Sequence, residues 1–236
     1  MIRSYIRKIW QNRWIIRFLP AIIWFNFKHL PFRQAIKLPI LLYKPKFANT
    51  SGRIVIDAAI RFGMIRLGVN EVSIYPNDGI MIDNKGSITF RGGVSIGNRS
   101  AIAVGPKGQL VFEDNLIATC ALKLVCYHDI YFEKDILIGW NTMLCDFDFH
   151  KLSYLKGGYS KGYGRIRIGH NTWIANGCKI YKNVEIPPFC VVGADTILKK
   201  PVKCESYTLI CNSRPVEIKN QGVYRNYADD IIDDIR

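Results

Sequence analysis

The segment from Cys145 to His150, with the sequence CDFDFH, brings two carboxylates and an imidazole close together in the chain. An imidazole has a pKa of about 6.5, so it can take a proton from an attacking hydroxyl and return it to a leaving group. Alternate side chains of a strand point to one side, so we expect Asp146 and Asp148 beside His150, orienting its ring or binding a substrate hydroxyl. These three are the predicted catalytic residues, with His150 as the base. A solvated loop histidine beside a polar outer face is the alternative.

Residues 150–166 form a segment rich in glycine, tyrosine and cations. This segment interrupts a repeat, which breaks after Phe149 and resumes at Ile168. A long interruption has to loop out of the repeat, and such loops commonly carry function. We therefore predict that residues 150–166 form the wall of an acceptor site.

A period of six residues dominates the sequence between Ile168 and Lys203, which reads IGHNTW, IANGCK, IYKNVE, IPPFCV, VGADTI, LKKPVK. The first positions are all aliphatic: Ile168, Ile174, Ile180, Ile186, Val192 and Leu198. The fifth positions are all small or β-branched: Thr172, Cys178, Val184, Cys190, Thr196 and Val202. This period is typical of a solenoid in which three sixes form one triangular coil with the aliphatic side chains inside.

The same frame continues outside this block, at Phe132, Ile138 and Leu144 before it and at Cys204 and Ile210 after it. Further upstream only apolar pairs two residues apart recur: Ile54/Ile56, Ile65/Leu67, Val72/Ile74, Ile80/Ile82, Ile88/Phe90, Val94/Ile96 and Ile102/Val104. Their uneven spacing predicts irregular early coils. An antiparallel sandwich of short strands is the alternative for this upstream part.

The repeat IGHNTWIANGCKIYKNVEIPPFCVVGADTILKK resembles that of the bacterial hexapeptide-repeat O-acetyltransferases, which act on maltose, galactosides, xenobiotics and polysaccharides. The resemblance covers roughly residues 85–216. It implies a mainly β fold, a left-handed parallel β-helix, a homotrimer with active sites between subunits, acetyl-CoA as co-substrate and no metal. The segment CDFDFH resembles the Asp-x-Asp-Phe-His stretch of polysaccharide O-acetyltransferases, whose histidine is the general base, and this role passes to His150.

The resemblance also implies four residues for the coenzyme. Trp173, expected at an outward-facing corner, matches a family tryptophan beside the CoA arm or the neighbouring subunit. Lys199 and Lys200 match the lysine that follows the family's Val-Val-Thr stretch. Arg214 lies where the family ends in Gly-x-Pro-Ala-Lys, although the glycine and proline are displaced here. Cations suit the phosphates of CoA, and a solvated surface is the alternative for each of them.

Residues 1–50 form a basic, amphipathic segment with ten Lys or Arg and no Asp or Glu. Apolar residues at 2, 6, 9 and 10 share one helical face, and Pro20 is expected to end or kink the helix. The longest uncharged run, Phe18 to Phe27, is far shorter than the roughly 20 residues that span a bilayer. We predict peripheral contact of residues 1–45 with the inner face of the cell membrane. A helical cap on the first coil, or a contact in an oligomer, is the alternative.

The chain is predicted to divide into this segment, a β-helix catalytic domain over residues 51–216 and a C-terminal tail over residues 217–236. The net charge of +14 comes mostly from the N-terminal segment and no recognition motif accompanies it, so we expect no nucleic-acid partner. Seven cysteines without a CxxC pair indicate reduced thiols that serve as small apolar fillers, which favours the cytoplasm.

The predicted function is transfer of acetyl from acetyl-CoA to a hydroxyl of a free or lipid-linked carbohydrate in surface polysaccharide or glycolipid synthesis. Three alternatives remain open. The first is a nucleotide-sugar N-acetyltransferase. The second is a γ-carbonic-anhydrase-like metal site built from His128, His150 and His170, which are 22 and 20 residues apart. The third is an inactive scaffold at the membrane.

Overall fold

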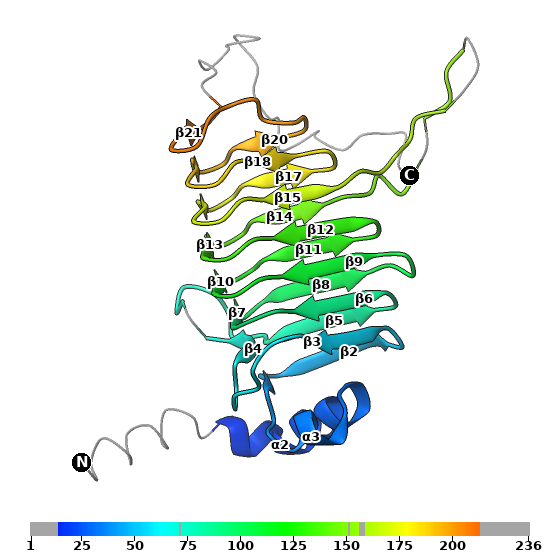
Figure 1. The fold of residues 1–236 in the computed structure, drawn as a ribbon, viewed down its shortest axis with the longest axis vertical. Coiled ribbons are helices and arrows are strands. Elements are labelled where there is room, and N and C mark those ends of the chain that lie inside the picture. The colour runs from blue at the N-terminus through cyan, green and yellow to red at the C-terminus, as the bar shows by residue number, and fades with distance from the viewer. Residues whose placement is uncertain (1–13, 71, 151, 156–158, 213–236) are drawn as a thin grey trace, which may run out of the picture.

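The chain is a parallel β-helix closed at one end by a short helical segment (Figure 1). The structure is a computed structural model and describes residues 14–70, 72–150, 152–155 and 159–212. Three all-parallel sheets form the three sides of the stack, and the chain visits them in turn. This confirms the predicted mainly β, parallel β-helical fold.

Each sheet takes one short strand from each coil. Sheet 1 contains β1 (Ile40–Leu42), β4 (Ile65–Val69), β7 (Val94–Gly97), β10 (Leu116–Ala118), β13 (Ile136–Ile138), β16 (Trp173–Ile174), β19 (Val191–Val192) and β21 (Leu209–Ile210). Sheet 2 contains β2 (Pro45–Thr50), β5 (Ile80–Asn84), β8 (Ser100–Val104), β11 (Lys123–Cys126), β14 (Met143–Cys145), β17 (Lys179–Tyr181) and β20 (Ile197–Leu198). Sheet 3 contains β3 (Arg53–Ile56), β6 (Ser87–Phe90), β9 (Gln109–Phe112), β12 (Asp129–Phe132), β15 (Ile166–Ile168) and β18 (Glu185–Ile186).

The six-residue frame is the core of the stack. Its aliphatic positions from Ile168 to Leu198 are buried, and the small fifth positions from Thr172 to Thr196 are buried beside them. The upstream frame positions Phe132, Ile138 and Leu144 are buried as well. Five of the cysteines are also buried and unpaired, as expected of small apolar fillers: Cys120, Cys126, Cys145, Cys178 and Cys190. The repeat therefore predicts the interior correctly.

The early coils are more regular than their spacing predicts. Ile54, Ile88 and Leu110 pair in unbroken register across sheet 3, which rules out the antiparallel sandwich. Phe90, Phe112 and Phe132 stack in successive coils with ring centroids 5.3 Å apart. The coils are longer than eighteen residues because their corners take extra residues, while the strands stay in register. Among the described strands, the register shifts between β2 and β5 and between β4 and β7.

Two predictions for the early part of the chain are wrong. The pair Val72/Ile74 forms no strand, and Ile74 is 67% exposed in the long corner between β4 and β5. The sheets also begin before residue 51, because β1 and β2 already belong to them. These two strands lie within residues 1–50, which the predicted domain boundaries separate from the β-helix because of their basic composition.

Helix α2 (Trp14–His29) caps the first coil, and the short helix α3 (Phe32–Ala35) follows it. Ile22, Phe25 and Asn26 are buried on the inner face of α2. The Asn26 side chain donates to the carbonyls of Ile22 and Ile40 and accepts from the Ile40 amide, at 2.8, 2.8 and 3.1 Å. This confirms the cap. The apolar face at residues 2, 6, 9 and 10 lies outside the described residues.

Pro20 does not end the helix, which continues for nine residues beyond it. The residues that bury the inner face lie after Pro20, so packing on β1 offsets the hydrogen bond that the proline removes. Within the described ranges, neither helix is long and apolar enough to cross a membrane.

Candidate functional site

An antiparallel arm leaves the stack between β14 and β15 (Figure 1). Phe147 bridges to Tyr163, and further out Ser153 bridges to Tyr159. The amide of Asp148 donates to the Gly162 carbonyl at 2.7 Å, and the Gly164 amide donates to the Asp146 carbonyl at 3.1 Å. The interruption therefore starts earlier than predicted, directly after Cys145 rather than after Phe149, and it is a hairpin.

The base of this arm lines an open cavity of about 490 Å³. Its lining residues are Phe147, Phe149, His150, Ser160, Lys161, Gly162 and Tyr163. Aromatic rings, one imidazole and one cation thus surround a single hollow. Its size suits a small ligand such as one sugar ring with its linkage.

The coil that precedes the arm supports the cavity from below. The Tyr127 ring meets the Phe149 ring edge to face, with centroids 4.9 Å apart, and the His128 ring meets Tyr163 in the same way at 4.9 Å. Aromatic pairs of this geometry stabilise a contact by about 0.5–1.5 kcal/mol beyond their buried area. These contacts hold the base of the arm against the stack.

His150 lines the cavity with an exposed side chain. The preceding residue, Phe149, has a positive φ of 63°, which turns the chain at this point. No hydrogen bond or ion pair joins the His150 side chain to any other described residue. Its imidazole is therefore free to bind a hydroxyl of an incoming ligand.

Asp146 does not lie beside His150, contrary to the alternation expected from the sequence. Its side chain is fully buried, and its carboxylate accepts the backbone N–H groups of Tyr127, His128 and Asp129 at 2.7, 2.8 and 2.7 Å. The reason is that β14 ends at Cys145, so strand alternation no longer applies. Asp146 binds the backbone of the preceding coil and does not line the cavity.

Asp148 is exposed and forms an ion pair with Lys182, which follows β17 in the next coil. It does not line the cavity either. The structure therefore joins Asp146 to the coil below and Asp148 to the coil above. Neither carboxylate is hydrogen-bonded to His150.

The predicted coenzyme residues lie on two different sides of the stack. Lys199 and Lys200 follow β20 and line a second cavity of about 650 Å³. They lie on the same edge as Lys182, because β14, β17 and β20 are neighbours in sheet 2 and the arm follows β14. Trp173 is instead the first residue of β16 in sheet 1, where its side chain points outward. Arg214 lies outside the described residues.

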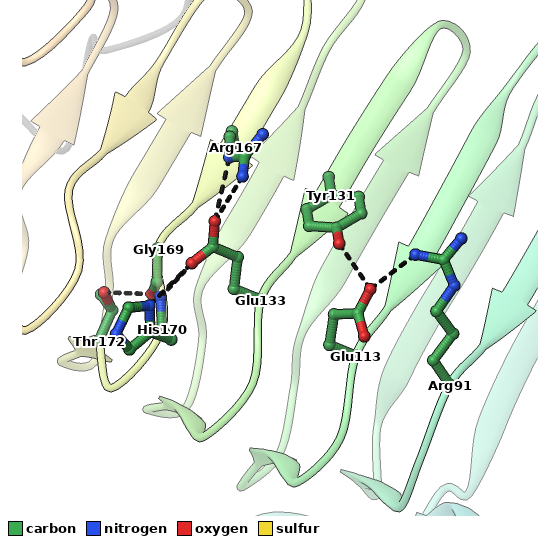
Figure 2. A network of polar contacts seen from close by, with 8 residues as sticks. All are labelled: Arg91, Glu113, Tyr131, Glu133, Arg167, Gly169, His170 and Thr172. Atoms are coloured by element: carbon green, nitrogen blue, oxygen red, sulfur yellow. Dashed lines mark hydrogen bonds and ion pairs between the residues drawn. The ribbon is translucent and has the colours of Figure 1, made fainter. Parts of the chain in front are cut away.

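A second polar cluster lies at the corners between sheet 3 and sheet 1 (Figure 2). The Glu133 carboxylate accepts hydrogen bonds from Arg167 at 2.6 Å and from the His170 amide at 2.9 Å, and lies 3.0 Å from His170 Nδ1. Burial raises the pKa of Glu133, but the bonds from Arg167 and His170 outweigh burial and hold this pKa below its usual range. A histidine hydrogen-bonded to a carboxylate is a second arrangement on this chain that could accept a proton from a ligand.

The two clusters are separated by the length of a strand. Tyr127 and His128 precede β12, whereas Glu133 follows it. The pair formed by Glu133 and His170 therefore faces a different corner from the arm. The ring of His170 packs edge to face on Phe189, with centroids 4.9 Å apart.

The three histidines of the metal-site alternative do not converge. His128 packs on Tyr163, His150 lines the cavity and His170 pairs with Glu133. Among the described residues, no group of three or more His, Cys, Asp or Glu side chains is arranged to hold a metal ion.

Comparison with known proteins gives no further indication of identity. No model of a known protein family matches the chain, and no curated protein matches it.

The sequence did not predict three residues that contact the arm: Tyr127 and His128, which pack on its aromatic rings, and Lys182, which pairs with Asp148. Each belongs to a neighbouring coil, one turn before or after the arm. The signal that would have found them is the coil length itself, because residues one turn apart lie side by side. Phe147 and Tyr163, by contrast, lie within or beside the predicted loop.

Proposed function

We propose that this protein is an acyltransferase that moves acetyl from acetyl-CoA to a sugar hydroxyl in surface polysaccharide or glycolipid synthesis. One observation carries this proposal: a parallel β-helix bears an antiparallel arm, and at the base of this arm an aromatic cavity is lined by a histidine without a hydrogen-bond or ion-pair partner among the described residues. The resemblance of the repeat to hexapeptide acetyltransferases supports the same reaction, together with a left-handed winding and a cytoplasmic location.

In this proposal His150 acts as the general base. Its imidazole takes the proton of the sugar hydroxyl while the hydroxyl oxygen attacks the thioester carbonyl. The carbon–sulfur bond then breaks, the proton passes to the CoA sulfur, and the products are an acetyl ester and free CoA. The flat faces of Phe149 and Tyr163 are suited to pack against the apolar face of a sugar ring.

The lysines above the arm suit the coenzyme. Lys199 and Lys200 are exposed and line their cavity together with apolar residues from β20 and the segment that follows it. Ammonium groups bind phosphate as point charges, and the apolar wall suits the pantetheine chain of CoA. Bound there, CoA would extend along the edge of sheet 2 toward the arm.

The deciding experiment uses acetyl-CoA and a panel of lipid-linked sugars, and measures free thiol together with the mass of the acetylated product. We expect His150→Ala to lower turnover by about 10²–10⁴-fold, the usual contribution of a general base. His170→Ala is the matched control, and we expect it to stay near wild type. The reverse result would assign the base to the pair formed by His170 and Glu133. Turnover that His150→Ala leaves unchanged would contradict the mechanism.

A nucleotide-sugar amine is the second candidate acceptor. The observation that favours it is that His150 lacks a carboxylate partner within the described part of the chain. An amine needs less help from a base than an alcohol does, so His150→Ala should then lose far less activity. The same panel, extended with amino-sugar nucleotides, separates the two acceptors by the amide or ester product. Turnover with no member of the panel would favour the inactive scaffold.

Sheet 1 supports the proposed homotrimer. From β10 onward its outward side chains form an apolar column in register, with Ile117, Leu137, Trp173, Val191 and Leu209 in successive coils. The outward side chains of sheet 3 are instead largely polar or charged, among them Asp129, Arg167 and Glu185. An apolar column on one side of a prism is the kind of surface that subunits bury.

A further inference from the structure

Helix α2 is apolar on both of its faces. Its inner face packs on β1, whereas Ile16, Ile23 and Phe27 are 70, 42 and 44% exposed on the opposite face. Their spacing of seven and four residues places these three side chains in one stripe along the helix. Phe32, 68% exposed at the start of α3, continues the stripe through an edge-to-face contact with Phe27, with centroids 5.9 Å apart.

This stripe faces away from the coils. Helix α2 lies at the end of the stack (Figure 1), and its inner face covers the first coil, so its outer face lies on the side away from that coil. No other element of the described chain covers it. An apolar stripe of this kind marks a surface that binds a partner.

The charges around the stripe have a single sign. Arg17 and Lys28 on α2, and Arg33 and Lys37 on and after α3, are all exposed. The sequence has no Asp or Glu before Asp57. The Lys28 ammonium lies 4.9 Å from the centre of the Trp24 ring, which is also exposed. Apolar side chains flanked by cations and aromatic rings complement the surface of an anionic bilayer.

A second copy of this chain suits the surface less well. Two copies packed cap to cap would bring the same cations face to face, and like charges in contact oppose binding. An anionic lipid surface accepts both the apolar stripe and its cationic margin.

We propose that the outer face of α2 and α3, centred on Ile16, Ile23, Phe27 and Phe32, docks the protein end-on onto an anionic membrane surface. The helix lies in the plane of the interface and does not cross the bilayer, in line with its length. The proposal concerns binding alone and does not rest on acyl transfer.

The test is co-sedimentation of the full-length chain with phosphatidylcholine vesicles, with and without added phosphatidylglycerol. We expect binding to the vesicles that contain phosphatidylglycerol and a loss of binding as salt screens the cations. The double variant Ile23→Gln/Phe27→Gln should weaken this binding by at least about tenfold, because two apolar side chains no longer enter the interface. The matched control is Met81→Gln/Ile197→Gln, which changes two comparably exposed apolar residues on sheet 2, and it should bind like wild type.

Equal binding of the two double variants would overturn the proposal, as would no binding of the wild type to either vesicle. Light scattering without lipid tests the rival occupant: a smaller assembly for Ile23→Gln/Phe27→Gln alone would show that a second copy covers the stripe. None of the four side chains belongs to the buried core, so we expect both variants to fold, and unfolding curves that match wild type check this.

Discussion

Two aspartates only two residues apart have opposite environments. Asp146 is fully buried and accepts three backbone N–H groups, whereas Asp148 is exposed and paired with Lys182. Hydrogen bonds to a buried charged group contribute much more to stability than an ion pair in contact with water. Asp146 therefore acts on the position of Tyr127 and His128, which in turn support the arm.

We expect Asp146→Asn to lower the free energy of unfolding by about 2–4 kcal/mol, because the amide NH₂ group meets backbone donors and an acceptor is lost. Asp148→Asn should cost less than about 1 kcal/mol. Urea unfolding of the two variants checks this. Similar losses for both would contradict the different roles assigned to the two carboxylates.

The two glutamates of Figure 2, each hydrogen-bonded to an arginine, make the stability of the fold depend on pH in the acid range. Burial raises the pKa of Glu113, but hydrogen bonds from Tyr131 and Arg91 outweigh it, so this pKa, like that of Glu133, lies below its usual range. A carboxyl group whose pKa is lower in the folded protein contributes its full stabilisation at pH values above its pKa in the unfolded chain, about 4.3. This stabilisation is lost as pH falls through the folded pKa.

Glu133→Gln should therefore lower the stability near neutral pH and flatten its decline in acid below about pH 4. The free energy of unfolding, measured across this range for wild type and variant, is the test. A decline in acid as steep as that of wild type would mean that Glu133 does not contribute to it.

At the scale of the elements, the spacing between coils limits which residues can occupy a strand. Gly97 ends β7, and a Cβ atom there would lie 1.7 Å from the Thr119 carbonyl oxygen of the next coil. At Gly193 the nearest atom, Cys211 Cβ, would be 3.2 Å away. Gly97 therefore makes room for the backbone of the next coil, whereas the nearest atom at Gly193 belongs to a side chain.

Gly97→Ala should destabilise the fold by about 1–3 kcal/mol or more, since backbone rather than a movable side chain blocks the new methyl group. Gly193→Ala is the control and should change stability by less than about 1 kcal/mol. Thermal or urea unfolding distinguishes them. Equal tolerance of both substitutions would show that the coils can separate locally.

The strands and the arm were not equally predictable from sequence. The positions from Ile168 to Leu198 predict the interior because one inward side chain per side of the prism imposes a strict period. Before Leu110 the corners vary in length and mask this period, and Ile74, an apolar residue on a long corner, is then mistaken for part of a strand. The break in the frame predicts that an arm exists, but not its contacts. Asp146 binds backbone N–H groups of a neighbouring coil, and because almost every residue type carries such a group, the sequence does not reveal these contacts.

At the scale of the whole molecule, the three sides of the prism differ in chemistry. Sheet 1 presents its apolar column, and sheet 3 presents charged side chains. If subunits bury sheet 1, a charge in the middle of the column should separate them. We expect Leu137→Glu to convert a trimer to monomers, and Met81→Glu, on sheet 2, to leave the assembly unchanged. Light scattering coupled to size-exclusion chromatography measures both. A trimer that persists in Leu137→Glu would show that another face joins the subunits.

The stack of coils also fixes how far the arm can reach from the cap. In sheet 2 the strands β2, β5, β8, β11 and β14 lie in consecutive order, and the arm follows β14. Neighbouring strands are about 4.8 Å apart, so the arm leaves the stack about 20 Å above the first coil. If the chain rests on its cap and acts on sugars, as proposed above, its acceptor would lie well beyond a lipid's headgroup, among the outer units of a glycan rather than at the unit attached to lipid. The number of coils between the cap and the arm sets this distance. Each coil added or removed there would shift the position of the acceptor by about the length of one sugar.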